Sequence, residues 1–560
     1  MAKGLDEGEG LGGIRPQLSV VDVYLGYMKI SFTLTVMILC ASPLLSQSTL
    51  YEWSGASDYD NFGRSVSDAG DLDNDGYPDV IVGAHLADPN GIINAGSAYA
   101  YSGKTGLLLY QWNGASATDY FGHSVAAAGD VNNDGFDDVI IGADQADPNG
   151  LASAGSAYIY SGNDGGLLYQ FNGLSELDFF GRSVDGAGDV NGDGFADVII
   201  GAYLADSNGI SHTGSAYVYS GSTGQLLHQW NGNNLFEYFG YSVSSAGDIN
   251  GDGYSDSIVG AFNTAPNGIN GAGTVYLFSG QNGSLLYQLD GTSEYDCFGC
   301  SVAMVGDVNG DNIDDIVIGA IGSDTTNLNN AGAAYVYSGD SGNILYELYG
   351  TSDSLFFGTS VSGAGDVNGD GVNDIVVGTD GVDASGYPLA GTAYVYSGSN
   401  GALLNQFEGE SDFDQLGYSV SGAGDLDGDG LDDIIVGAFM ADPNSQDNSG
   451  SAYAYSCRPS ADYNISNLIA GQNAVFDVSN APPYSHISIA YSIIGAGPTN
   501  TPFGMVDMSV PIRLLFTTTA GPQGGASFTK QVPLGATGII LYTQAKCGSV
   551  LSNSLALTVQ

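Results

Sequence analysis

Short apolar runs, separated by glycine, asparagine, aspartate and serine, fill most of the chain. Four such runs follow Phe62-Gly63: "SVSDAGD" from residue 65, "DVIVGA" from 79, "SAYAYSG" from 97 and "LLLYQWNG" from 107. β-Branched and aromatic residues dominate these runs, which predicts four short β-strands joined by turns. The second run is apolar on both faces, as in Val80-Ile81-Val82, which favours a sheet packed between two other sheets.

This four-run pattern occurs seven times with a step of 59 residues. One marker is an aspartate after the first run, at Asp71, Asp130, Asp189, Asp248, Asp307, Asp366 and Asp425. The other is a Phe-Gly pair beginning at Phe62, Phe121, Phe180, Phe239, Phe298 and Phe357, replaced by Leu416-Gly417 in the last copy. A unit repeated in constant register stacks on its neighbours to bury its apolar faces. Four strands repeated seven times predict an all-β fold, a seven-bladed β-propeller; the alternative is an open β-solenoid or a string of separate units.

The two ends of the array favour a closed ring. Copies of the fourth run begin near Leu107, Leu167, Leu226, Leu285, Ile344 and Leu403, and none follows Ser451 in the seventh copy. The stretch "LYEWSG" from Leu50 matches "LYQWNG" from Leu109, again 59 residues later. We therefore predict that the N-terminal strand completes the last blade, which removes two exposed sheet edges. The closed propeller is expected to span residues 48–456.

Each repeat carries a loop of the form D-x-[DN]-x-D-G-x-x-D, with one change, between its first two runs. Side-chain oxygens at positions 1, 3, 5 and 9, with the backbone carbonyl at position 7, provide the crowded hard ligands that Ca²⁺ prefers. The predicted ligands are Asp71, Asp73, Asp75, Tyr77 and Asp79; Asp130, Asn132, Asp134, Phe136 and Asp138; Asp189, Asn191, Asp193, Phe195 and Asp197; Asp248, Asn250, Asp252, Tyr254 and Asp256; Asp307, Asn309, Asp311, Ile313 and Asp315; Asp366, Asn368, Asp370, Val372 and Asp374; and Asp425, Asp427, Asp429, Leu431 and Asp433.

Two further features of the loop bear on this prediction. Glycine at position 6 permits the sharp turn, and Asn312 replaces it in the fifth copy, where we expect a weaker site. The loop is not an EF-hand, because position 12 of the first copy is Val82, within a strand, rather than glutamate. The alternative is that the aspartates only cap turns. The side chains at positions 1, 3, 5 and 9 include 23 carboxylates, four in the first and last copies and three in the others. Their mutual repulsion favours neutralisation by up to seven Ca²⁺ ions.

The charge of the chain is negative and very uneven. The 560 residues are 43% apolar and 13% charged, which is typical of a globular protein, and the net charge is −52. Residues 48–456 hold 55 acidic residues against three bases, whereas residues 457–560 hold three acids and four bases. We place a domain boundary near residue 457. A field this negative argues against nucleic acid or anionic lipid as a partner and favours cations.

Residues 28–47 read as a secretory signal peptide. One lysine, an apolar run and then small residues follow Met28, and the run is too short to span a membrane. Residues 1–27 show no usable pattern, and we expect them to be an over-extended gene start, with translation beginning at Met28. The mature chain is therefore expected to be exported and to carry no membrane span.

Residues 457–560 lack the repeat and contain short runs such as "NAVFDVS" and "ISIAYSII", which predict a small β-sandwich. Surface attachment, sorting and partner binding all fit this domain. Two cysteine pairs also stay open as disulfides: Cys297 with Cys300, and Cys457 with Cys547.

The order of Phe-Gly, Ser-Val, aspartate loop and a strand ending in Gly-Ala resembles the FG-GAP repeat, over residues 48–456. That repeat builds the seven-bladed propeller of integrin alpha subunits and occurs in many secreted bacterial proteins. The resemblance implies that the aspartate loops bind Ca²⁺ on the lower face of the ring. The proline that closes the family's motif is absent, since the copies read "GAH", "GAD", "GAY", "GAF", "GAI", "GTD" and "GAF".

We expect a secreted or cell-surface protein that acts in adhesion or recognition, with structural Ca²⁺ and an extracellular protein or glycan as its ligand. Variable loops on the face opposite the aspartate loops, with Tyr59, Tyr120, Phe179, Tyr238 and Phe356, form either a binding surface or blade-edge packing. The alternative function is a secreted hydrolase or lyase that degrades polysaccharide through paired carboxylates. The sequence shows no serine–histidine–acid set or phosphate loop, so no catalytic residue is predicted.

Overall fold

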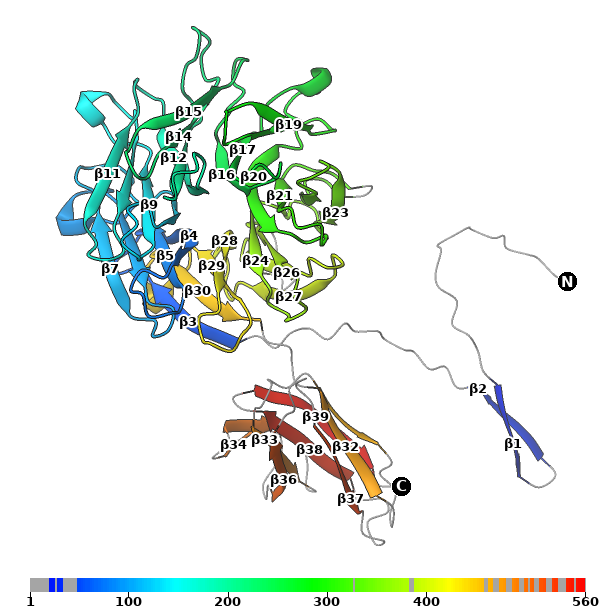
Figure 1. The fold of residues 1–560 in the computed structure, drawn as a ribbon. Coiled ribbons are helices and arrows are strands. Elements are labelled where there is room, and N and C mark those ends of the chain that lie inside the picture. Colours follow the sequence, from blue (N-terminus) through cyan, green and yellow to red (C-terminus); the bar gives the residue numbers. More distant parts are fainter. Residues whose placement is uncertain are drawn as a thin grey trace, which may run out of the picture. The chain divides into compact units, whose positions relative to one another are not determined.

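The computed structural model describes residues 48–325, 328–381 and 387–457, together with the backbone of the strands at 20–25 and 28–33 and of nine strands between 462 and 558. Seven four-stranded antiparallel sheets form a ring of blades (Figure 1). The first blade consists of β4 (Phe62–Gly70), β5 (Asp79–Ala84), β6 (Ser97–Tyr101) and β7 (Leu108–Asn113). The predicted all-β propeller with four strands in each blade is therefore confirmed.

The other blades keep the same strand order. Their strands are β8 (Val125–Gly129), β9 (Asp138–Ala143), β10 (Ser156–Tyr160) and β11 (Leu167–Asn172); β12 (Phe180–Gly188), β13 (Asp197–Ala202), β14 (Ser215–Tyr219) and β15 (Leu226–Asn231); β16 (Ser242–Gly247), β17 (Asp256–Ala261), β18 (Thr274–Phe278) and β19 (Leu285–Asp290); β20 (Phe298–Gly306), β21 (Asp315–Ala320), β22 (Ala333–Tyr337) and β23 (Ile344–Tyr349); β24 (Ser360–Gly365), β25 (Asp374–Thr379), β26 (Thr392–Tyr396) and β27 (Leu403–Glu408). Short 3₁₀ turns lie in the loops at η1 (Pro89–Gly91), η2 (Pro148–Gly150), η3 (Pro266–Gly268) and η4 (Pro443–Ser445).

The seventh blade is completed by the N-terminal strand, as predicted. Strands β28 (Leu416–Gly424), β29 (Asp433–Ala438) and β30 (Ser451–Ser456) pair in order, and β3 (Ser48–Ser54) adds the outer edge. Trp53 is opposite Ala452 in that register, and Figure 1 shows blue β3 beside yellow β30. This pairing joins the two ends of the propeller across about 400 residues and closes the ring.

Apolar side chains fill the spaces between adjacent blades. All six residues of β5 are buried, and so are all six of the equivalent strand in every other blade. Phe62 is buried and packs against the rings of Tyr99 and Tyr101. Gly63 adopts φ +86°, and a Cβ there would lie 2.2 Å from the Ser451 carbonyl oxygen of the preceding blade. The Phe-Gly marker thus combines a core side chain with a residue that permits close contact between backbones.

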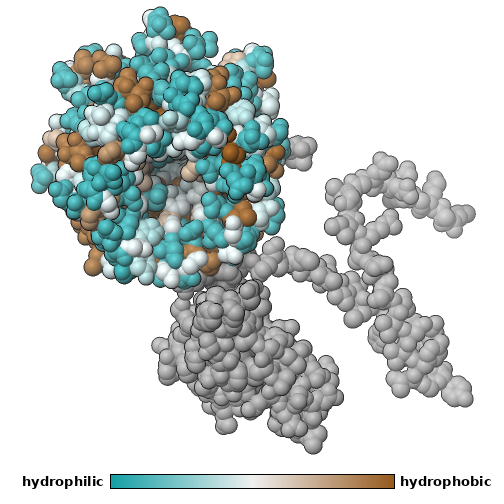
Figure 2. Space-filling model, in the orientation of Figure 1, coloured by the Kyte–Doolittle hydropathy of each residue, from teal (hydrophilic) through white to brown (hydrophobic). Residues whose placement is uncertain are grey.

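A ring of hydrogen bonds links the innermost strands. The amide of Val125 donates to the hydroxyl of Ser65 in the preceding blade at 3.1 Å, and the amide of Val66 donates to Ser419 at 3.0 Å across the closure. The same bond joins most of the other neighbouring blades, at Val184, Val243, Val361 and Val420. These strands surround a hollow at the axis of the ring, which is visible in Figure 2.

The remaining described strands lie outside the propeller. β1 (Val20–Leu25) and β2 (Met28–Thr33) form a hairpin. Towards the C-terminus, β31 (Asp462–Ser466), β32 (Asn473–Ser479) and β37 (Ala526–Gln531) form one sheet; β36 (Arg513–Thr519), β33 (His486–Ser492), β38 (Ile540–Cys547) and β39 (Val550–Thr558) form a second; β34 (Pro498–Thr501) pairs with β35 (Gly504–Asp507). The predicted packing of these sheets as a β-sandwich stays a prediction, as do the signal peptide and the start at Met28.

Two other observations concern the described residues. Cys297, Cys300 and Cys457 are free thiols, so the Cys297–Cys300 disulfide is not formed, whereas the side chain of Cys547 lies outside the described residues. Among the residues that the structure describes, no helix has the length and apolar character needed to cross a membrane.

Closure of the ring predicts the energetic effect of Trp53. Trp53 is 8% exposed, stacks on Tyr101 of the first blade at 4.9 Å, and donates from Nε1 to the Gly106 carbonyl at 2.9 Å. We expect Trp53→Ala to destabilise the protein by about 3–5 kcal/mol in chemical denaturation followed by circular dichroism.

Trp112 provides a matched control, because it makes the equivalent contacts with Tyr160 and Gly165 away from the seam. A closed ring predicts similar losses for Trp53→Ala and Trp112→Ala. A negligible loss for Trp53→Ala beside a full loss for Trp112→Ala would show that the ring is open in solution.

Candidate metal centres

The last aspartate of each loop is the first residue of the second strand in its blade and is completely buried. In the first blade, Asp79 accepts hydrogen bonds from the amides of Leu72 at 2.9 Å and Gly103 at 3.0 Å. Leu72 belongs to the aspartate loop and Gly103 to the turn between β6 and β7. The position-9 carboxylate therefore fastens the loop to the body of its blade.

The first aspartate closes the turn itself. Asp71 accepts from the amide of Asp75 at 3.0 Å and from the amide of Gly76 at 2.9 Å. Gly76 has φ +86°, and a Cβ there would meet no atom within 4 Å. Asn312, the one replacement at position 6, has φ +67° and also donates to the first aspartate of its loop, Asp307. The open space explains why asparagine is accepted there.

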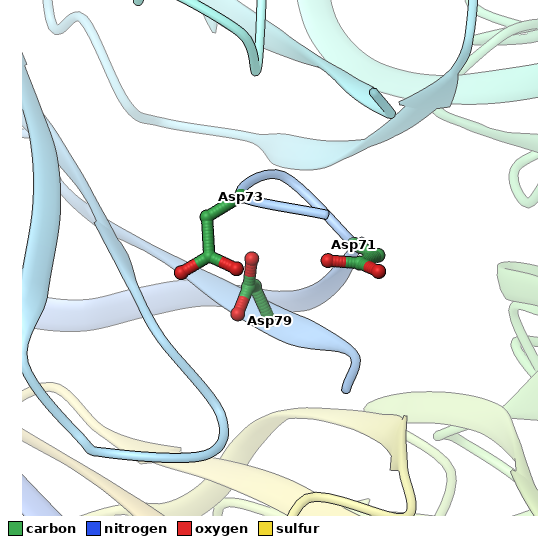
Figure 3. Close-up of side chains that lie close together, drawn as sticks. All are labelled: Asp71, Asp73 and Asp79. Carbon is green, nitrogen blue, oxygen red and sulfur yellow. The ribbon is translucent and has the colours of Figure 1, made fainter. Parts of the chain in front are cut away.

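Position 3 divides the seven loops into two kinds. In the five middle copies it is asparagine, whose side-chain amide donates to the position-9 aspartate, as Asn191 does to Asp197 at 3.1 Å. In the first and last copies it is aspartate, so two carboxylates face each other. One carboxylate oxygen from each of Asp71, Asp73 and Asp79 lies within 4.8 Å of the other two. The same holds for Asp425, Asp427 and Asp433. Figure 3 shows the first of these clusters inside the turn.

In the first copy, the side chains at positions 5 and 7 both contact Lys104. Asp75 accepts from the amide of Tyr77 at 3.1 Å, and its other oxygen forms an ion pair with Lys104 at 3.3 Å. The Tyr77 ring lies under the same ammonium group, 4.4 Å from its centroid. Of the predicted side-chain ligands in the first copy, the structure thus groups positions 1, 3 and 9 and leaves position 5 engaged with the next turn.

Burial and mutual repulsion weaken the acidity of the position-9 carboxyls. Burial raises the pKa of Asp79 to about 7, and the nearby Asp73 acts in the same direction. Burial, followed by the charge of Asp427, raises the pKa of Asp433 to about 8. At neutral pH such groups are unfavourable as bare anions, so a bound proton or a cation stabilises them.

Asp433 also lacks a hydrogen bond that its counterparts have. In the other six blades, the Oδ1 atom accepts from a glycine amide 24 residues further on, as in Gly103. In the seventh blade that position is Cys457, where the chain leaves the propeller, and Asp433 Oδ1 is buried with no hydrogen-bond partner among the described residues. An unsatisfied buried carboxylate oxygen beside two other carboxylates is suited to a hard divalent cation such as Ca²⁺.

Of the aromatic side chains predicted for the face opposite the aspartate loops, one is exposed and the others are half-buried. Tyr59 is 56% exposed, whereas Tyr120, Phe179, Tyr238 and Phe356 are half-buried. Tyr120 packs edge-on against His85, and Phe179 and Tyr238 both pack against Tyr203. Neither of the two sequence interpretations accounts for all of these positions.

The seven copies also match a known repeat. The FG-GAP repeat family matches residues 62–101, 121–160, 180–219, 239–278, 298–337, 357–396 and 416–455, which together make up half of the chain. The chain belongs to the FG-GAP repeat family. Each match runs from the Phe-Gly position, or Leu416-Gly417 in the last copy, through the aspartate loop to the third strand of a blade, so every candidate metal loop lies within this FG-GAP unit.

Integrin alpha subunits are among the relatives of this FG-GAP protein. Integrin alpha-5 of Xenopus laevis is 34% identical over 224 residues, which are 37% of this chain and 20% of that protein. Integrin alpha-V of Gallus gallus is 33% identical over 223 residues, 37% of this chain and 21% of that protein. The chain thus spans about a fifth of the length of the relatives that it matches.

Exchanging aspartate and asparagine at position 3 of the loops tests whether the paired carboxylates repel each other. In Asp73→Asn, the new amide can donate to Asp79 as Asn191 donates to Asp197. We expect this variant to be more stable than the parent by about 1 kcal/mol in a chelating buffer, because a carboxylate repulsion is replaced by a hydrogen bond. Thermal unfolding in EDTA measures the change.

The reverse exchange, Asn191→Asp, serves as the control and should destabilise the chelated protein. With calcium present, both differences should shrink or reverse, since a cation bridges paired carboxylates. Destabilisation by Asp73→Asn in EDTA would contradict the repulsion inferred from the geometry.

Proposed function

We propose that this protein is a secreted calcium-binding propeller that acts in adhesion or recognition outside the cell. The observation that carries the proposal is the pair of carboxylate clusters in the first and last loops, with the unsatisfied Asp433 Oδ1 in one of them. Clusters of carboxylate oxygens around a buried aspartate, on a chain of net charge −52, support cation binding at these loops.

Calcium would be held by positions 1, 3, 5 and 9 of each loop and by the backbone carbonyl at position 7, in up to seven sites. When bound, the ion supplies positive charge that neutralises the loop carboxylates. The chain's own residues do the structural work: Asp79 anchors the loop to the blade, and Asp71 closes the turn through two backbone amides. We therefore assign the ions a structural role.

The likeness to integrin alpha subunits supports a recognition role at the cell surface or in the matrix. The ligand is proposed to be an extracellular protein or glycan that meets the variable loops opposite the aspartate loops. These loops carry exposed apolar side chains at Tyr59, Leu177, Phe236, Tyr295 and Phe413. All five have positive φ and donate their amide to a loop of the preceding blade, which presents the side chain on a rigid backbone.

A polysaccharide-degrading enzyme remains the competing proposal. The carboxylates of the aspartate loops are poor candidates for its catalytic pair, because backbone amides already hold Asp71 and Asp79. The relatives described above are integrin alpha subunits, which favours recognition over turnover.

A binding screen separates the two proposals. The purified mature chain is applied to arrays of glycans and matrix proteins in about 1 mM CaCl₂ and in EDTA, a range suited to extracellular calcium sites. We expect binding to at least one ligand in calcium, loss of that binding in EDTA, and recovery after calcium is restored.

The same samples are assayed for release of reducing or unsaturated ends from polysaccharides. Turnover that is abolished by a single substitution of an acid outside the aspartate loops would favour the enzyme and contradict the recognition proposal.

A further inference from the structure

A second cluster of charged side chains lies at the opposite end of the innermost strands from the metal loops. Each innermost strand ends at its aspartate loop, and near its start the residue after the Phe-Gly position faces the axis of the ring. Arg64, His123, Arg182, Tyr241 and Tyr418 occupy that position in five of the blades and line a pocket of about 200 Å³, here termed the axial pocket. The constant step of 59 residues brings these side chains together.

The composition of the axial pocket is unusual for this chain. Only three basic residues are present among residues 48–456, which hold 55 acids, and two of the three, Arg64 and Arg182, line this one pocket. The third, Lys104, pairs with Asp75 at an aspartate loop. Two of the propeller's three basic side chains therefore converge at one place, although acids outnumber bases by 55 to three.

His123 lies between the two guanidinium groups. Its Nδ1 donates to Asp144 Oδ1 at 3.1 Å, and its Nε2 accepts from Arg182 and, at 3.5 Å, from Arg64. Burial, followed by the charge of Arg182, lowers the pKa of His123 to about 4. The imidazole is therefore neutral at physiological pH and positions both guanidinium groups through a single acceptor atom.

The two arginines differ in how their charge is balanced. Arg182 lies 3.9 Å from Asp144 and donates to the Tyr241 hydroxyl at 3.3 Å. Arg64 stacks on Tyr418, 4.2 Å from the ring centroid. Among the described residues, no carboxylate oxygen lies within 4.0 Å of the Arg64 guanidinium.

Two acids beside the axial pocket already accept hydrogen bonds from side chains that line it. Asp144 accepts from His123, and Asp380, which lies in the equivalent position of the sixth blade, accepts from the Thr359 hydroxyl at 3.3 Å. Of the five N–H donors of a guanidinium, Arg64 uses one in a hydrogen bond to a described residue, His123. A partly buried guanidinium with unused donors is suited to an anion supplied from outside the chain.

Serine hydroxyls add further donors. The serine that follows each of these positions lines the same pocket, and six of the seven accept a hydrogen bond from the valine amide of the next blade. In the described part of the chain, none of these six hydroxyls donates to another residue, so each keeps its proton for a ligand. The six serines are Ser65, Ser124, Ser183, Ser301, Ser360 and Ser419.

We propose that the axial pocket binds one carboxylated sugar residue of an extracellular glycan, with its carboxylate on Arg64 and Arg182 and its hydroxyls on the serines. This inference rests on the proposed recognition function and names the ligand class for it. Guanidinium groups match a carboxylate in shape and charge, and hydroxyl-rich surroundings suit the remainder of a pyranose ring.

The charge of the propeller and the size of the axial pocket limit which anions can bind there. The propeller as a whole repels polyanions such as nucleic acids or heavily sulfated chains, because acids outnumber bases by 55 to three. A pocket of about 200 Å³ accommodates a single ring-sized group rather than a folded segment of protein. A sparsely charged glycan with isolated uronate units meets both conditions.

Isothermal titration calorimetry of the calcium-loaded mature chain tests the assignment, with sodium glucuronate as the probe and glucose as its neutral counterpart. We expect one saturable site for glucuronate and binding of glucose that is at least tenfold weaker. Arg64→Gln should weaken glucuronate binding at least tenfold, because it removes the guanidinium that is not paired with a carboxylate. Lys104→Gln, the matched loss of one positive charge at the other face, should leave the affinity unchanged.

Thermal unfolding of each variant shows whether it is folded. Arg64→Lys provides a second test. We expect it to lose less glucuronate affinity than Arg64→Gln, because the positive charge stays while the paired N–H donors of the guanidinium are removed. The proposal fails if glucuronate does not bind the parent chain, or if Arg64→Gln binds as tightly as the parent. Equal affinity for acetate would overturn the sugar assignment, and equal affinity for N-acetylaspartate amide would indicate an acidic protein partner instead.

The two proposals fail separately. If calcium-dependent ligands emerge from the array screen but glucuronate does not bind, only the axial-pocket inference is wrong. If glucuronate binds but no array ligand depends on calcium, the proposed function is wrong and the pocket assignment stands.

Discussion

One buried carboxylate in each blade holds the aspartate loop in place, and the rest of the structure depends on it. Asp79 and its six counterparts begin the second strand, are fully buried, and accept backbone amides from the loop. In six blades, the turn between the third and fourth strands donates as well. Removing a charge from water without a counter-charge is costly, so seven such groups require neutralisation by protons or by cations. The negative charge of the chain therefore destabilises the aspartate loops, and bound metal would neutralise it where each loop is attached to its blade.

The ring distributes two kinds of chemistry between its two faces. Each innermost strand has its aspartate loop at one end and the residue that follows the Phe-Gly position near the other. Hydrogen bonds from valine amides to serine hydroxyls tie these strands together around the axis, and β3 closes the ring against β30. Because the axial pocket takes one side chain from each of several blades, its geometry exists only in the closed ring. In this account, calcium at one face maintains the scaffold on which the opposite face binds its ligand.

The sequence predicted the blades and their closure because both depend on local pattern and constant spacing, whereas the calcium ligands of the loops stay a prediction. Position 6 illustrates this: Gly76 and Asn312 both adopt positive φ, as the turn requires. Three features could not be predicted from the sequence alone. The asparagine at position 3 donates to the position-9 aspartate in the structure, a role that residue type alone does not reveal. Asp433 loses its glycine partner because the chain leaves the propeller at that point. The axial pocket joins Arg64, His123 and Arg182, which follow one another at steps of 59 residues, at a repeat position whose residue type varies among the blades. The step of 59 residues shows that these three residues are equivalent, but only the geometry of the ring shows that their side chains lie close together.

The most direct test of the account is the metal content of the purified mature chain together with its melting temperature in calcium and in EDTA. Neutralisation of the buried carboxylates by cations predicts bound calcium, at up to seven ions per chain, and a marked fall in the melting temperature when EDTA removes them. A metal-free protein whose melting temperature is the same in calcium and in EDTA at neutral pH would contradict the account.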